Sequence, residues 1–160
     1  MPAAADKLLS QHWDGRLPVD VFHVARRQGI ATRPSSTICD SGMIELEGTD
    51  GSHVAIITYR ASDAPVRQQF TVAHEIGHHV LGHLGERQRC LRDPLTHFSS
   101  NATPLIEREA NDFAVRLLVP RRTLEFAVHE KGMTDVVALA RAFGVAPAAM
   151  QHRLELLGMA

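Results

Sequence analysis

The first thirty residues carry apolar side chains at helical spacing. Leu8, Leu9 and His12 define a short helix over residues 3–13. A second helix is predicted over residues 18–29, with Pro18 at its first turn and a glycine as its stop. The chain is therefore expected to begin with two short helices.

An alternating pattern follows, which is typical of strands. Residues 30–33 suit a short strand, and residues 43–47 alternate between apolar and acidic side chains, as a half-exposed strand does. Residues 53–59 are apolar on both faces, which indicates a more central strand. A turn cluster at residues 48–51 joins the last two segments, so we expect an antiparallel hairpin.

The helix predicted over residues 65–81 has a clear apolar stripe. Its members recur every three or four residues: Val66, Phe70, Ala73, Gly77 and Val80. At 100° per residue, His74 and His78 fall on one margin of the stripe and Glu75 lies just beyond. The same wheel places His79 and His83 on the far side, towards solvent.

The rest of the chain is predicted to be helical after a polar loop over residues 85–104. Four helices are expected there: residues 105–119, 121–130, 135–143 and 147–157. The pattern predicts an α+β fold, with a short, mostly antiparallel sheet packed with several helices and a helical C-terminal half. We expect one domain over residues 1–160, made of an N-terminal part (1–64), a central helical part (65–131) and a C-terminal helical hairpin (132–160).

Composition removes several classes of function. The net charge of -1 offers no global attraction to nucleic acid, and no apolar run approaches the roughly 18 residues of a membrane span. Residues 1–13 lack the apolar core of a secretion signal, and the two cysteines, Cys39 and Cys90, do not require a disulfide. A cytoplasmic protein is expected. Histidine is unusually frequent, with ten residues.

Two of these histidines form the pattern H-E-x-x-H, His74-Glu75-Ile76-Gly77-His78. On a helix they lie one turn apart on the same face, so both imidazoles can bind one Zn²⁺ ion. Glu75 is then placed to act as a general base towards water. The alternative is two partly buried histidines on an ordinary helix. The apolar stripe beside them argues against this alternative.

A catalytic zinc site needs a third protein ligand. The extended pattern H-E-x-x-H-x-x-G-x-x-H is excluded, because Leu81 and Leu84 occupy its last two positions. Two glutamates of the next helix remain. On its wheel Glu107 lies near the apolar face, with Asn111 one turn on, whereas Glu109 lies on a solvated flank. We therefore predict Glu107 as the ligand and Asn111 as a residue supporting it.

His79 and His83 also stand four residues apart, a spacing that a second zinc site could use. No carboxylate stands between them at the position of a general base. Surface histidines are the preferred interpretation.

The sequence resembles the ImmA/IrrE family of metallo-endopeptidases over nearly the whole chain. The matching blocks are Arg67-x-x-Phe70-Thr71-x-Ala73-His74-Glu75-x-Gly77-His78-His79, Glu107-x-Glu109-Ala110-Asn111-x-Phe113-Ala114 and Leu117-Leu118-Val119-Pro120. Val119 departs from the Met that the family usually has. The resemblance implies a small zincin-like domain, one zinc ion on His74, His78 and Glu107, and Glu75 as general base. It also implies cleavage of a helix-turn-helix repressor of the XRE type, relieving repression in a stress, mobile-element or toxin–antitoxin context.

Three features stay open at this level. The donor that would stabilise the oxyanion is not identified, with His97 in the loop and Tyr59 at a strand end as candidates. The strand over residues 43–47 either holds an extended substrate or is a plain solvated edge. A non-proteolytic regulator or toxin–antitoxin component, binding protein or DNA, is the alternative function.

The last two helices have helix-turn-helix spacing, with Gly144 at the turn. The second of them offers Gln151, His152 and Arg153, but also Glu155, and its surroundings are not basic. We prefer a helical hairpin packed on the core to a DNA reader, so direct binding of nucleic acid is not expected. Docking of a repressor is a third possibility.

Overall fold

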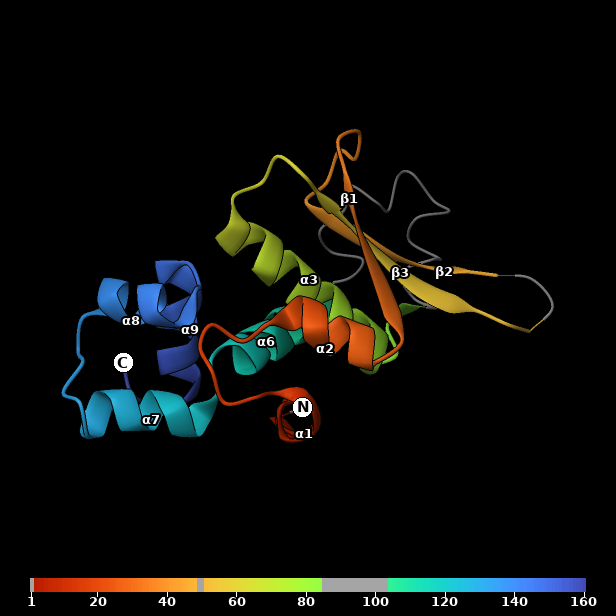
Figure 1. Ribbon diagram of the computed structural model, residues 1–160. Helices are drawn as coiled ribbons and strands as arrows, with labels where there is room; N and C mark the ends of the chain where they lie inside the picture. The colour runs from red at the N-terminus through yellow and green to blue at the C-terminus, as the bar shows by residue number, and fades with distance from the viewer. Residues whose placement is uncertain (1, 49–50, 85–103) are drawn as a thin grey trace.

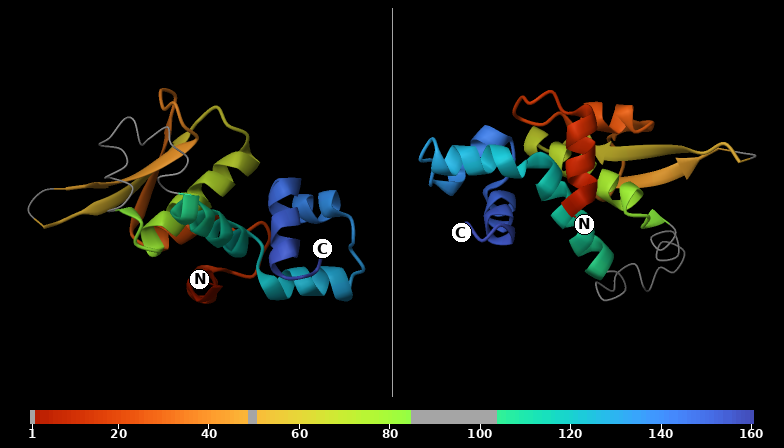
Figure 2. Two further views of the ribbon diagram at one scale, coloured as in Figure 1. Left: turned by 180° about the vertical axis from the view of Figure 1, so that it is seen from behind. Right: turned by 90° about the horizontal axis from the view of Figure 1, so that it is seen from below.

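The computed structural model describes residues 2–48, 51–84 and 104–160. A small sheet lies at one end of the molecule and the C-terminal helices lie at the other, with two long helices between them (Figures 1 and 2). Buried apolar residues from every helix and strand that the structure describes join one hydrophobic cluster. The fold is α+β, as the pattern predicted.

The N-terminal part begins with α1 (Pro2–His12) and α2 (Val21–Arg27). The second helix starts three residues later than Pro18 suggested. Its N-cap is Asp20, whose carboxylate accepts a hydrogen bond from the backbone N–H of His23 at 3.0 Å. A side-chain acceptor for the unpaired N–H groups thus decides where this helix begins.

The sheet contains β1 (Ile30–Ser35), β2 (Gly42–Glu47) and β3 (Val54–Arg60), in the order β1-β3-β2. The predicted hairpin is confirmed, with β2 antiparallel to β3 and Ile44 opposite Ile57. The sheet is nevertheless mixed, because β1 runs parallel to β3. The prediction of a mostly antiparallel sheet was wrong at this pair, since the hairpin turns β3 back into the direction of β1.

The centre of the fold is the pair α3 (Pro65–Val80) and α6 (Pro104–Leu118). The predicted stripe on α3 is only partly correct. Its buried residues include Val72 and Ile76, which the stripe left out, besides Ala73 and Gly77, whereas Val66 is 39% exposed. The helix is buried over more of its circumference than one stripe because the sheet and α2 cover one side and α6 covers the other.

The C-terminal helices are α7 (Arg121–His129), α8 (Val136–Phe143) and α9 (Pro147–Leu156). Arg153 of α9 is only 2% exposed, and its Nε donates to the carbonyl of Val119 at 3.0 Å. Gln151 donates to Glu155 on the same helix. Arg153 thus joins α9 to the end of α6, as the packed-hairpin interpretation expects.

Three further expectations concern membrane spans, the cysteines and the polar loop. Within the described residues, no helix is long and apolar enough to cross a membrane. Cys39 is exposed and unpaired. The polar loop predicted over residues 85–104, with Cys90 and His97, lies almost entirely outside the described residues.

Candidate metal centre

Three predicted ligands meet between α3 and α6. Nε2 of His74 lies 2.9 Å from Nε2 of His78, and Oε2 and Oε1 of Glu107 lie 3.1 and 3.3 Å from these two nitrogens. One ligand atom from each residue lies within 4.8 Å of the others. Among the described residues, this is the one such group of three or more histidine, cysteine or acidic side chains.

The hydrogen bond between His74 and Asn111 indicates which nitrogen of His74 is available to bind a cation. Its Nδ1 lies 2.9 Å from Oδ1 of Asn111, an oxygen that can only accept, so Nδ1–H is the donor. In a neutral imidazole, Nε2 then carries a lone pair, which faces His78 and the carboxylate of Glu107. The lone pairs of the two histidine nitrogens and the carboxylate oxygens of Glu107 then face one another, and a cation bound between them would stabilise this arrangement.

The charge of Glu107 strengthens this conclusion. In the metal-free protein, hydrogen bonds donated by protonated Nε2 atoms of His74 and His78 hold the pKa of its carboxyl far below the usual range and outweigh the effect of burial, and a bound cation would take the place of those protons. The side chain is therefore ionised at neutral pH. Two neutral imidazoles and one carboxylate are a donor set that Zn²⁺ binds well.

Glu75 lies beside this group. Its side chain is 2% exposed, and it lines a cavity of about 320 Å³ with His74, Asn111 and Thr71. The start of β2 lies directly over it. A Cβ atom on Gly42 would clash with Cγ2 of Thr71 and lie 3.8 Å from Cγ of Glu75. The absence of a side chain at Gly42 thus lets the edge strand approach the carboxylate.

The expectation for His83 was wrong. It is 5% exposed, and its Nδ1 lies 3.1 Å from Nδ1 of His78. Its Nε2 lies 2.9 Å from Oε2 of Glu109, the residue assigned to a solvated flank. His79 is half-buried rather than exposed, and burial lowers its pKa. The wheel failed for His83 because α3 ends before it.

Of the two candidate oxyanion donors, Tyr59 lies in the described part of the chain, and it is not among the residues that line the cavity. The Tyr59 ring packs edge-on against Phe22 with a centroid distance of 5.3 Å, on the face of β3 that also buries Ile57. This is ordinary packing at the end of a strand, and a catalytic role for Tyr59 stays a prediction. His97 lies outside the described residues.

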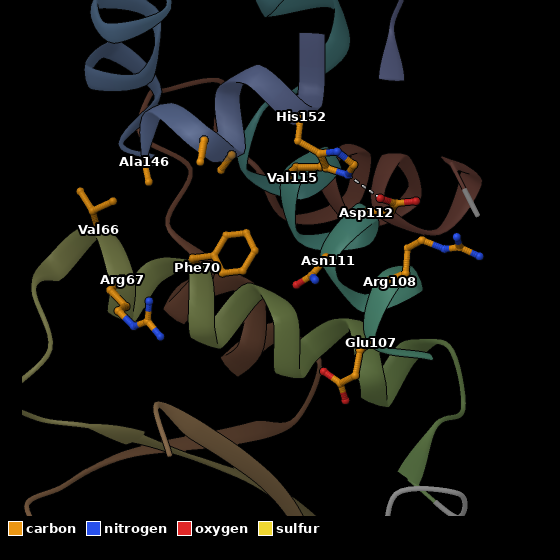
Figure 3. Close-up of a pocket in the computed structure, with 12 residues that line it drawn as sticks. Val66, Arg67, Phe70, Glu107, Arg108, Asn111, Asp112, Val115, Ala146 and His152 are labelled. Atoms are coloured by element: carbon orange, nitrogen blue, oxygen red, sulfur yellow. Dashed lines mark hydrogen bonds and ion pairs between the residues drawn. The ribbon is translucent and has the colours of Figure 1, made fainter. Parts of the chain in front are cut away.

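A second, mostly apolar cavity of about 710 Å³ adjoins the metal centre, and the sequence pattern did not indicate it. It lies between α3, α6 and α9, with Val66 and Phe70 on one side and Val115 and Ala146 across from them (Figure 3). Glu107 and Asn111 line its inner end. Val66 lies in the exposed first turn of α3, where its apolar side chain opens onto this cavity.

An α+β domain whose H-E-x-x-H helix faces a carboxylate on a second helix has the arrangement of a zinc metallopeptidase. A model of the IrrE N-terminal-like domain of the Peptidase M78 family matches residues 25–155, and the chain belongs to this family. Membership suggests a metal-dependent peptidase.

Solved structures add a likeness in fold. A transcriptional regulator of Mycobacterium tuberculosis superposes with a TM-score of 0.65 at 20% sequence identity. The alignment covers 96% of this chain but 45% of the regulator, so this chain spans less than half of that protein. No curated protein matches the chain significantly.

Proposed function

We propose that this chain is a zinc-dependent endopeptidase, with His74, His78 and Glu107 as ligands of one zinc ion and Glu75 as general base. The observation that carries the proposal is that one possible ligand atom from each of His74, His78 and Glu107 lies within 4.8 Å of the others, beside a buried glutamate. A zinc site of purely structural purpose has no use for such a carboxylate, and it would be closed by a fourth protein ligand.

A bound Zn²⁺ ion supplies Lewis acidity, which polarises a carbonyl and makes water a better nucleophile. Glu75 accepts the proton of the attacking water at a carboxylate oxygen and returns it to the leaving amine nitrogen. Asn111 holds His74 in the tautomer whose Nε2 faces inward. Burial of Glu75 keeps bulk water from competing for that proton.

Two features would hold the substrate. β2 is an edge strand of the described sheet, and its first residue lies over Glu75, so an extended peptide added to that edge would pass the metal centre. The apolar cavity would receive an apolar side chain close to the scissile bond, because Glu107 and Asn111 belong to both places. We therefore expect cleavage of extended segments next to an apolar residue.

The substrate we propose is a helix-turn-helix repressor of the XRE type, and the site is proposed to act in relieving repression in a stress, mobile-element or toxin–antitoxin context. This rests on the resemblance to the ImmA/IrrE family. The second candidate is a non-proteolytic regulator that binds its partner, which the fold likeness to a transcriptional regulator favours. A cytoplasmic location belongs to the same proposal.

The test compares wild-type protein with Glu75→Gln, each loaded with zinc and incubated with an XRE-type repressor encoded beside it. We expect about one zinc ion in both proteins and cleavage by the wild type alone. Equal cleavage by Glu75→Gln contradicts the role of Glu75. Cleavage of an unstructured protein but not of the repressor contradicts the substrate class only, and zinc-bound wild type that binds the repressor without cutting it supports the regulator.

A further inference from the structure

The end of α3 brings His83 back to a metal ligand. Gly82 has a φ of +78°, its N–H donates to the carbonyl of His79 at 3.2 Å, and the N–H of His83 donates to the carbonyl of His78 at 2.9 Å. This pair of bonds is a Schellman motif, which reverses the chain and packs the residue after the glycine against the last helical turn. In most such motifs that contact is apolar; here it joins two imidazoles.

The hydrogen bonds beyond His78 have one consistent direction. The carboxylate of Glu109 can only accept, so Nε2–H of His83 donates to it. Nδ1 of a neutral His83 is then an acceptor, and Nδ1–H of His78 donates to it. Nε2 of His78 consequently keeps its lone pair, directed at Nε2 of His74 and at Glu107.

We propose that His83, held by Glu109, is a positioning residue that fixes the tautomer and ring orientation of His78 for metal binding. The inference rests on the proposed metal site and not on peptidase activity. A carboxylate acting through one imidazole on another increases the electron density at the binding nitrogen, and supports of this kind are typically worth 10- to 100-fold in metal affinity. The two glutamates of α6 thus have separate roles: Glu107 binds the metal, and Glu109 binds the histidine behind it.

The burial of His83 distinguishes a positioning role from that of a histidine on the surface. His83 and His78 are both buried, and their ring centroids lie 5.2 Å apart in an edge-on arrangement. His79 is the natural comparison, because it adjoins His78 in sequence but its Nδ1 has no hydrogen-bond partner among the described residues. A histidine that merely fills space would be replaceable by a ring of similar size.

The experiment measures zinc affinity by competition with a chromophoric chelator, and the visible absorption spectrum of the Co²⁺-substituted protein. His83→Phe keeps a ring but removes the acceptor, and we expect zinc to bind about 10- to 100-fold more weakly with an altered Co²⁺ spectrum. His83→Gln restores an oxygen acceptor for Nδ1–H of His78 and should recover much of the affinity. The control His79→Phe should bind zinc like the wild type.

A second variant tests the same inference without changing the buried His83. Glu109→Leu leaves His83 in place and changes a half-exposed side chain, and it should also weaken zinc binding. The melting temperature of each metal-free variant, measured beside that of the wild type, reports folding separately. Zinc affinity of His83→Phe and Glu109→Leu within twofold of the wild type overturns the inference and leaves the proposed function standing. A wild type that binds no zinc overturns both.

Discussion

At the scale of single residues, Gly77 is a point at which the metal-binding helix packs tightly against α6. A Cβ atom there would lie 2.9 Å from Cδ1 of Phe113, closer than packed carbon atoms tolerate. Gly77 also lies between the two histidine ligands on α3. The contact therefore fixes how near the ligands of α3 come to Glu107.

Gly77→Ala sets two effects against each other. Helix propensity alone would stabilise the protein by about 1 kcal/mol, whereas overpacking against Phe113 costs about 2 kcal/mol. We expect a net loss of about 1 kcal/mol in the free energy of unfolding, measured by urea denaturation of the metal-free protein. A gain of about 1 kcal/mol would show that the two helices move apart freely, contrary to the packing described.

Residues inside α3 could be placed from the sequence, and those beyond its end could not. The spacing of His74 and His78 follows from the helix itself, and the wheel of the next helix separated Glu107 from Glu109. For His83 the wheel does not apply, because Gly82 at positive φ ends the helical path. Gly82 is the signal in the sequence for this contact, because a Schellman glycine reverses the chain and packs the next residue against the last helical turn.

At the scale of helices and strands, the apolar cavity makes α9 part of the proposed substrate site. Ala148 on α9 lines the cavity and is exposed, so its side chain can be enlarged without disturbing the core. The C-terminal helical hairpin would then help to select the substrate, because α9 forms one side of the cavity.

Ala148→Trp should fill part of the cavity. We expect KM to rise several-fold for a peptide with a large apolar residue beside the scissile bond, with zinc content unchanged. Val137→Trp is the control, because Val137 is exposed on α8 and lies away from the cavity. Equal kinetics for the two variants would mean that the cavity does not hold substrate.

Most elements were predictable because their signals are local. The helix over residues 65–81 and the hairpin of β2 and β3 follow from periodicity and turn residues. The parallel pairing of β1 with β3 is a contact between distant segments, which no local pattern encodes. The cavity between α3, α6 and α9 was missed for the same reason, since three separate elements create it.

At the scale of the whole molecule, the hydrophobic core is continuous and contains none of the three proposed metal ligands. Buried residues of all the described elements belong to it, including Phe113, Leu117 and Met150. The metal-free protein should therefore fold, with zinc adding stability through binding to the folded state alone.

Zinc at about 100 times its dissociation constant should stabilise the fold by about 2.7 kcal/mol. For a domain of this size that corresponds to a rise in Tm of about 5 to 11 °C, at about 2 to 4 °C per kcal/mol. Calorimetry with and without zinc measures it, with His74→Ala as the control that should show almost no rise. Complete unfolding on removal of zinc would contradict the independence of the core.

The central claim is that His74, His78 and Glu107 together bind one zinc ion beside Glu75. Anomalous diffraction at the zinc absorption edge, from crystals of the zinc-loaded protein, tests it most directly. We expect one strong peak in contact with Nε2 of His74, Nε2 of His78 and the carboxylate of Glu107, with His83 behind His78 and out of contact with the peak. A peak bound by His83 and Glu109, with Glu107 turned away, would contradict it.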